Sequence, residues 1–144
     1  MSCHRPLGLR CDMSNAAQVL VVYGVLILAT GFILGSILGM VRMNEPSVRN
    51  LATAHVETLM QGAMHLGLAF AVVITAFDSG AATLGAWLLV IGSAMQAVGV
   101  TLNWAQDVGD QFAERSTGFF VNSASTLVIS PGLAIIVIGV LANI

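Results

Sequence analysis

Hydrophobic residues dominate four long segments of the chain, which are separated by three short polar connections. The segments run from Ala16 to Val41, Leu51 to Phe77, Ala82 to Ala105 and Thr117 to Ala142. Each has the 20 or so residues that a helix needs to cross a hydrocarbon core about 30 Å thick. The pattern predicts an all-α fold, an integral membrane bundle of four helices.

The composition also indicates a membrane protein. Of the 144 residues, 57% are hydrophobic and 8% are charged, whereas charged residues make up about a quarter of an ordinary soluble domain. Every Asp and Glu except Glu57 lies in a terminus or a connection, as the bilayer requires. We therefore expect a multi-pass protein in contact with the lipid bilayer, with a bacterial inner membrane as its location.

The charged residues exclude one class of partner and leave the orientation open. The formal net charge is −2 and no basic cluster occurs, so nucleic acid is not expected as a partner. Arg42, Arg49 and Arg115 fall on one side of the predicted membrane, and Arg5 and Arg10 fall on the other. A difference of one arginine does not decide which side is internal.

The predicted helices leave room for a single domain. We assign residues 14–144 to one transmembrane domain and residues 1–13 to an N-terminal extension, whose Cys3 and Cys11 have neither metal-ligand spacing nor a catalytic partner. Met13 is a possible alternative start, because Ser14 or Asn15 would then cap the first helix directly.

The second apolar segment carries an unusual set of polar residues. At about 100° per residue, His55, Glu57, Gln61 and His65 fall within an arc of roughly 160°, together with Thr58 and Gly62. A charged Glu at the centre of a membrane helix costs about 2.5–3.5 kcal/mol on insertion scales, so such residues usually face a bundle interior and have a function there. The alternative is a face that only forms hydrogen bonds between helices.

Stripes of small residues on the first and third segments predict close helix packing. The first segment contains Gly31, Gly35 and Gly39 in a GxxxGxxxG pattern, which serves packing either within one chain or between chains. The third segment places Gly85, Gly92, Gln96, Gly99 and Asn103 on one narrow arc. We expect this arc to pack against the polar face of the second helix. In the fourth segment, Pro131 predicts a kink.

His55 is the best candidate for a metal ligand. It lies about one turn inside the second helix, and a neutral imidazole binds haem iron, zinc or copper. Zinc needs three or four ligands, but His65 is about 15 Å further along the axis and Glu57 points about 160° away. A haem needs only one axial ligand from the protein, so it fits His55 better than zinc does.

The run AHVETLMQG, from Ala54 to Gly62, resembles a known signature. It is similar to the second helix of the hydroxylaminobenzene mutases, approximately A-H-L-E-x-x-M-N-G, and more distantly to the styrene oxide isomerases. Asn103 and Trp104 resemble an Asn-Trp pair near the end of the mutase third helix. Chain length and the four-helix plan agree over residues 14–144, although the specific match covers about a dozen positions.

The resemblance implies a membrane isomerase that holds haem b in a homotrimer. By position, His55 would be the axial ligand, Glu57 would match the mutase glutamate and Gln61 would orient substrate, with Asn103 as the third catalytic candidate. In the styrene oxide isomerases, ferric iron acts as a Lewis acid on the epoxide oxygen. The sequence departs from the epoxide isomerases at two points: Gln61 replaces Asn, and the third helix has no tyrosine. Both departures weaken the assignment of an epoxide substrate more than that of a hydroxylamine.

These observations favour a mutase that rearranges a small aromatic substrate, converting an N-arylhydroxylamine to an aminophenol. The alternatives are an epoxide isomerase of the styrene oxide type, a non-catalytic haem protein, and a small transporter that moves protons through Glu57 and His65.

Overall fold

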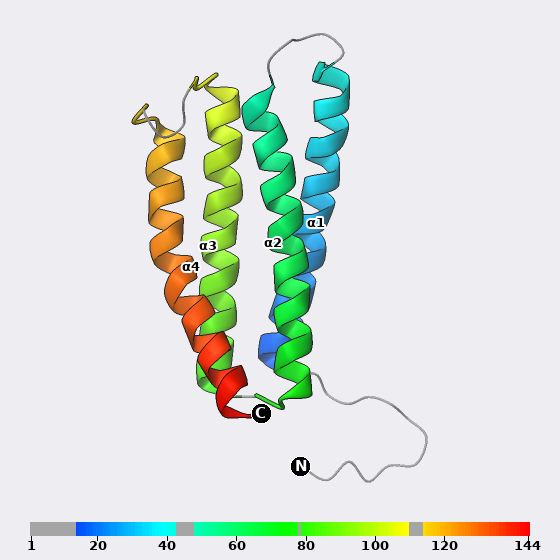
Figure 1. Ribbon diagram of the computed structural model, residues 1–144, viewed down its shortest axis with the longest axis vertical. Coiled ribbons are helices and arrows are strands. Elements are labelled where there is room, and N and C mark those ends of the chain that lie inside the picture. Colours follow the sequence, from blue (N-terminus) through cyan, green and yellow to red (C-terminus); the bar gives the residue numbers. More distant parts are fainter. Residues whose placement is uncertain (1–13, 43–47, 78, 110–113) are drawn as a thin grey trace.

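The computed structural model describes residues 14–42, 48–77, 79–109 and 114–144. These residues form α1 (Asn15–Arg42), α2 (Arg49–Ile74), α3 (Gly80–Ala105) and α4 (Thr117–Ala142) (Figure 1). All four helices are long and apolar enough to cross a membrane. The predicted all-α membrane bundle is therefore confirmed. The N-terminal extension, with Cys3 and Cys11, lies outside the described residues.

Serine side chains start three of the helices. The Oγ atom of Ser14 accepts a hydrogen bond from the Ala17 amide at 3.2 Å, as the sequence predicted for the start of α1. Ser79 and Ser116 cap α3 and α4 in the same way, at 3.1 and 3.0 Å. Each bond satisfies one of the backbone N–H groups that a helix leaves unpaired at its start. α2 begins without such a side-chain cap and ends before Ala76, whose φ of 52° is left-handed.

The four helices are arranged as two tightly packed pairs. α1 packs most extensively on α2, and α3 on α4, while the contact between the two pairs is smaller. Figure 1 shows α3 and α2 in the middle of the assembly, with α4 and α1 on the outside. The described parts of α1 and α4 share no contact. The two pairs meet mainly where α3 contacts α1 and α2, and α2 also makes a smaller contact with α4.

The glycine stripe of α1 packs on α2 of the same chain. Gly24 lies against Leu66, Gly31 against Leu59 and Gly35 against His55. These contacts follow each other in antiparallel order, at the same seven- and four-residue intervals on both helices. From the sequence, this stripe could pack within one chain or between chains. In the structure, Gly31 and Gly35 pack against α2 of the same chain. A side chain at Gly39 would have no neighbour within 4 Å.

The glycines of α3 pack on α4, so the prediction that they face the polar side of α2 was wrong. The opposed pairs are Gly85 with Gly132, Gly92 with Ser125, and Gly99 with Gly118. The reason is that α4 also carries small residues every seven positions, so the two backbones can approach closely along their whole length. Small residues on both helices make α4 the better partner for this face of α3.

Pro131 does not interrupt α4. The helix continues to Ala142, and Figure 1 shows it changing direction in its second half, as expected where a proline removes a backbone donor. The next residue, Gly132, lies against the backbone of Leu89 and the carbonyl of Gly85. The bend therefore occurs where α4 is packed against α3.

We expect Gly92→Ala to destabilise the α3–α4 pair by about 1–3 kcal/mol, the usual cost of overpacking. A methyl group at this position would meet the Ile129 backbone nitrogen at 2.9 Å, where little can move. The matched control is Gly67→Ala on α2, where no atom lies within 4 Å and where Ala is the better helix former. Thermal unfolding in detergent measures both. Equal stability of the two variants would show that α3 and α4 are loosely packed at Gly92.

Candidate functional site

The polar face of α2 is divided between two neighbouring helices. His55 contacts α1, whereas Glu57 and His65 form hydrogen bonds with side chains of α3. Gln61 lies between these positions along the helix and is buried. The four polar residues predicted from the sequence therefore share one helix face without converging on a single point.

His55 has one ring nitrogen in a fixed hydrogen bond and the other available. Its Nδ1 lies 2.8 Å from the carbonyl oxygen of Gly31. A carbonyl only accepts, so Nδ1 carries the proton, and the neutral ring keeps its lone pair on Nε2. The ring lies against Gly35, where a Cβ atom would meet Cε1 at 2.6 Å. A histidine that binds a metal through one ring nitrogen commonly donates a hydrogen bond from the N–H of the other to a carbonyl in this way.

His65 has both ring nitrogens occupied. The side chain is fully buried. Its Nδ1 lies 2.7 Å from the Gln61 carbonyl oxygen, and its Nε2 lies 3.5 Å from the Oγ atom of Ser93 on α3. Its ring also packs against that of Tyr23 on α1, with the ring centres 5.1 Å apart and the planes tilted by 59°. His65 therefore links α1, α2 and α3 and has no free nitrogen for a metal.

Glu57 is paired with an amide of α3. The Nε2 atom of Gln96 donates to Oε2 of Glu57 over 3.4 Å. This is the contact between the polar face of α2 and the third helix that the sequence predicted for Gln96. The side chain of Glu57 is only partly buried. A carboxylate held in this way at membrane depth can exchange a proton with a bound molecule.

Gln61 has a buried oxygen without a partner. The residue is 8% exposed, and its Oε1 atom accepts no hydrogen bond within the described part of the chain. A buried acceptor left unpaired costs about 1–3 kcal/mol. Because Gln61 follows Glu57 by one helical turn, the two side chains are neighbours on the surface of α2. The arrangement places a buried hydrogen-bond acceptor beside Glu57.

Asn103 lies apart from the other predicted site residues. It is fully buried, and its Oδ1 accepts from Ser116 at 2.7 Å. It is turned toward α4, where a side chain at Gly118 would collide with it. Its Nδ2 has no partner among the described residues. The structure places Asn103 at the junction of α3 and α4, not beside Glu57 and Gln61.

A bare metal ion would have few ligands here. Among the described residues, no group of three or more His, Cys, Asp or Glu side chains could hold an ion. His55 alone offers a free nitrogen on the polar face of α2.

No family model, curated protein or solved structure matches the chain. The assignment of its function therefore depends on the site itself.

Sequence inspection assigned no role to Tyr23 or Ser93, although both contact His65. The sequence carried a signal for each. Tyr23 is the single tyrosine of the chain and stands within an apolar helix, and Ser93 borders the predicted small and polar arc of the third helix. The sequence does not predict how α1 and α3 are rotated about their axes, and this rotation directs both residues toward His65.

Proposed function

We propose that this protein is a membrane-embedded isomerase that converts an N-arylhydroxylamine to an aminophenol. The observation that carries the proposal is the unpaired Oε1 of Gln61, buried one turn from Glu57. A substrate with a hydrogen-bond donor would satisfy this oxygen and lie beside a carboxylate. The resemblance of Ala54–Gly62 to the mutase signature supports the same activity.

The choice between hydroxylamine and epoxide follows from the same atom. An N-arylhydroxylamine carries both N–H and O–H donors, whereas an epoxide oxygen only accepts. An epoxide would leave Oε1 of Gln61 unpaired, at a cost of about 1–3 kcal/mol. Sites that hydrogen-bond a substrate OH or NH strongly reject analogues that lack it. The hydroxylamine is therefore the better substrate for this site.

The proposal includes haem b as cofactor, held by Nε2 of His55. The residue fits this role because its Nδ1 hydrogen bond to Gly31 fixes the tautomer and the ring orientation. When bound, the haem iron would supply a Lewis acid for the departing oxygen. The chain offers one such nitrogen on α2, which is what a haem with a single axial protein ligand requires.

The residues of the chain would hold the substrate and move its proton. Gln61 would accept a hydrogen bond from the N–OH group and so orient the aromatic ring. Glu57, steadied by Gln96, would stabilise the positive charge that develops on the ring after the N–O bond breaks. Once the departed oxygen has bonded to a ring carbon, Glu57 would accept the proton of that carbon and return it to the nitrogen. The apolar helices around the site would keep bulk water from trapping the cation.

We also propose a homotrimer in a bacterial inner membrane. His55 is only partly buried within one chain, and a side chain at the nearby Gly39 would meet no atom within 4 Å. A neighbouring copy would cover this part of the α1–α2 pair and enclose the cofactor. Gly31 and Gly35 do not contribute to this proposal, because they pack against α2 of the same chain.

The purified protein should convert N-phenylhydroxylamine to an aminophenol faster than it isomerises an aryl epoxide. The preference follows from the donor that Gln61 requires. Product analysis by chromatography, with equal amounts of each substrate and the haem-loaded protein, measures the ratio. A clear preference for the epoxide would contradict the substrate class, and turnover of neither compound would contradict the isomerase.

A further inference from the structure

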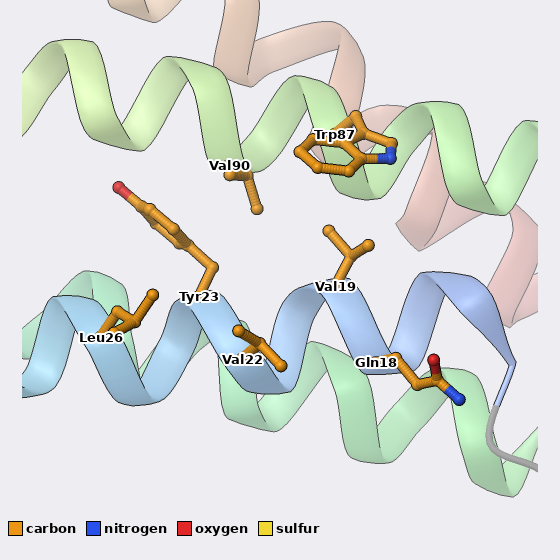
Figure 2. A pocket seen from close by; sticks show the side chains of 7 residues that line it. All are labelled: Gln18, Val19, Val22, Tyr23, Leu26, Trp87 and Val90. Atoms are coloured by element: carbon orange, nitrogen blue, oxygen red, sulfur yellow. The ribbon is translucent and has the colours of Figure 1, made fainter.

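A groove lies between α1 and α3, away from His55, Glu57 and Gln61. It has a volume of about 420 Å³, which is within the usual range for small-molecule sites. Figure 2 shows Val19 rising from α1 toward Trp87 and Val90 of α3, and Tyr23 extending from α1 on the other side of Val90 from Trp87. The remaining lining residues are Gln18, Val22 and Leu26.

The lining of the groove is mostly apolar and partly aromatic, with the amide of Gln18 at one end. From Gln18 to Leu26 it extends about 12 Å along α1, which suits one or two fused rings. Tyr23 and Trp87 both face it, and stacked aromatic pairs gain about 0.5–1.5 kcal/mol beyond the area they bury. Val22 is 61% exposed and Trp87 is 50% exposed, so the groove opens sideways toward lipid.

The Tyr23 hydroxyl is the polar feature that selects the occupant. It forms no hydrogen bond with any described residue. Tyr23 lies about 8 Å from the midpoint of α1, well inside a hydrocarbon core of half-thickness about 15 Å. Water is absent at that depth, and an unsatisfied hydroxyl there is costly. A lipid acyl chain would not relieve this cost, whereas a molecule with its own hydroxyl would.

Tyr23 is also held firmly in place. Its ring packs against His65, whose two nitrogens are fixed by the Gln61 carbonyl and by Ser93. The hydroxyl therefore has a defined position on the wall of the groove. A polar group in a mostly apolar site gives orientation and specificity to a bound molecule.

We propose that this groove binds a small neutral aromatic molecule that carries a hydroxyl group and enters from the lipid. Its ring stacks with Tyr23 and Trp87, and its hydroxyl pairs with that of Tyr23. The residues that line this groove include none of those assigned to the isomerase, so the two sites can be tested separately.

The test is binding of 4-nitrophenol, with 4-nitrotoluene as a probe of the same shape without the hydroxyl. Both quench tryptophan emission, and in a Trp104→Phe background Trp87 is the remaining tryptophan. The titration uses the full chain in nanodiscs at mildly acidic pH, where the phenol is neutral. Tyr23→Phe should weaken 4-nitrophenol binding about tenfold, the effect of losing one hydrogen bond, and should leave 4-nitrotoluene unchanged.

Two further variants test the location. Val22→Phe should fill the groove and abolish saturable quenching by both probes, whereas Val25→Phe, which is exposed on the same helix but does not line the groove, should behave like the parent. Equal affinity of 4-nitrophenol for the parent and Tyr23→Phe would overturn the proposal. A changed oligomeric mass in Val22→Phe would also overturn it, because another copy of the chain would then occupy the groove.

Discussion

His55→Ala should lose the haem Soret band almost completely, while His65→Ala should keep most of it. The difference follows from the ring nitrogens. His55 has a free Nε2 after its bond to Gly31, whereas both nitrogens of His65 are engaged within the protein. Absorption spectra of the detergent-purified variants, normalised to protein, measure haem content directly.

A rescue experiment separates ligand loss from unfolding. Replacing His55 with Ala removes the ring that lies against Gly35, so helicity must first be compared by circular dichroism. Free imidazole should then restore the Soret band in His55→Ala, because it can enter the space left by the ring. Equal haem content in the wild type and His55→Ala would refute the ligand assignment.

Glu57→Gln should lower mutase turnover by a factor of about 10² or more, the usual contribution of a general base. Glutamine keeps the shape of the side chain and can still form a hydrogen bond with Gln96. It removes the negative charge that stabilises the developing cation and the group that accepts the ring proton. Steady-state kinetics with N-phenylhydroxylamine, at equal haem occupancy, measure the loss.

The matched control is Glu114→Gln, which makes the same change at an exposed position outside the helices. It should leave turnover and haem content unchanged. Undiminished turnover in Glu57→Gln would show that Glu57 only pairs with Gln96. A loss of haem together with turnover would instead point to a structural role and would contradict the assignment of Glu57 as a base.

The helices could be predicted from the sequence because a membrane fixes both their length and their composition. All four predicted segments correspond to helices in the structure, with ends that differ by at most three residues. Arg49 and Gly80, at the starts of α2 and α3, lay outside the apolar runs and were missed. The exact ends of the helices depend on local backbone geometry, such as the left-handed φ of Ala76 after α2. Hydropathy carries little information about that geometry.

The partner of each helix face was harder to predict. The spacing of Gly85, Gly92 and Gly99 correctly indicated one closely packed face, but helical periodicity does not identify the neighbour. Gly118 and Gly132 on α4 provided the missing information, because small residues on two helices allow their backbones to meet. A comparison of seven-residue spacings between segments would have found this pairing.

The candidate site was predictable by residue type and less so by contact. Periodicity placed Glu57, Gln61 and His65 on one face of α2, and that face is turned toward the rest of the bundle. The separate surroundings of His55 and His65 depend on where α1 and α3 present Gly31 and Ser93. Those positions follow from the packing of helices that are distant in sequence, which hydropathy does not encode.

The division into two helix pairs has a consequence for biosynthesis. α1 and α2 leave the ribosome first, as a hairpin that can close on its own through Gly24, Gly31 and Gly35. The partners of Glu57 and His65 on α3, Gln96 and Ser93, are then still to be made. During that interval the translocon or lipid headgroups must solvate the side chains of Glu57 and His65. The second hairpin then supplies their hydrogen-bond partners and holds the first hairpin in the membrane.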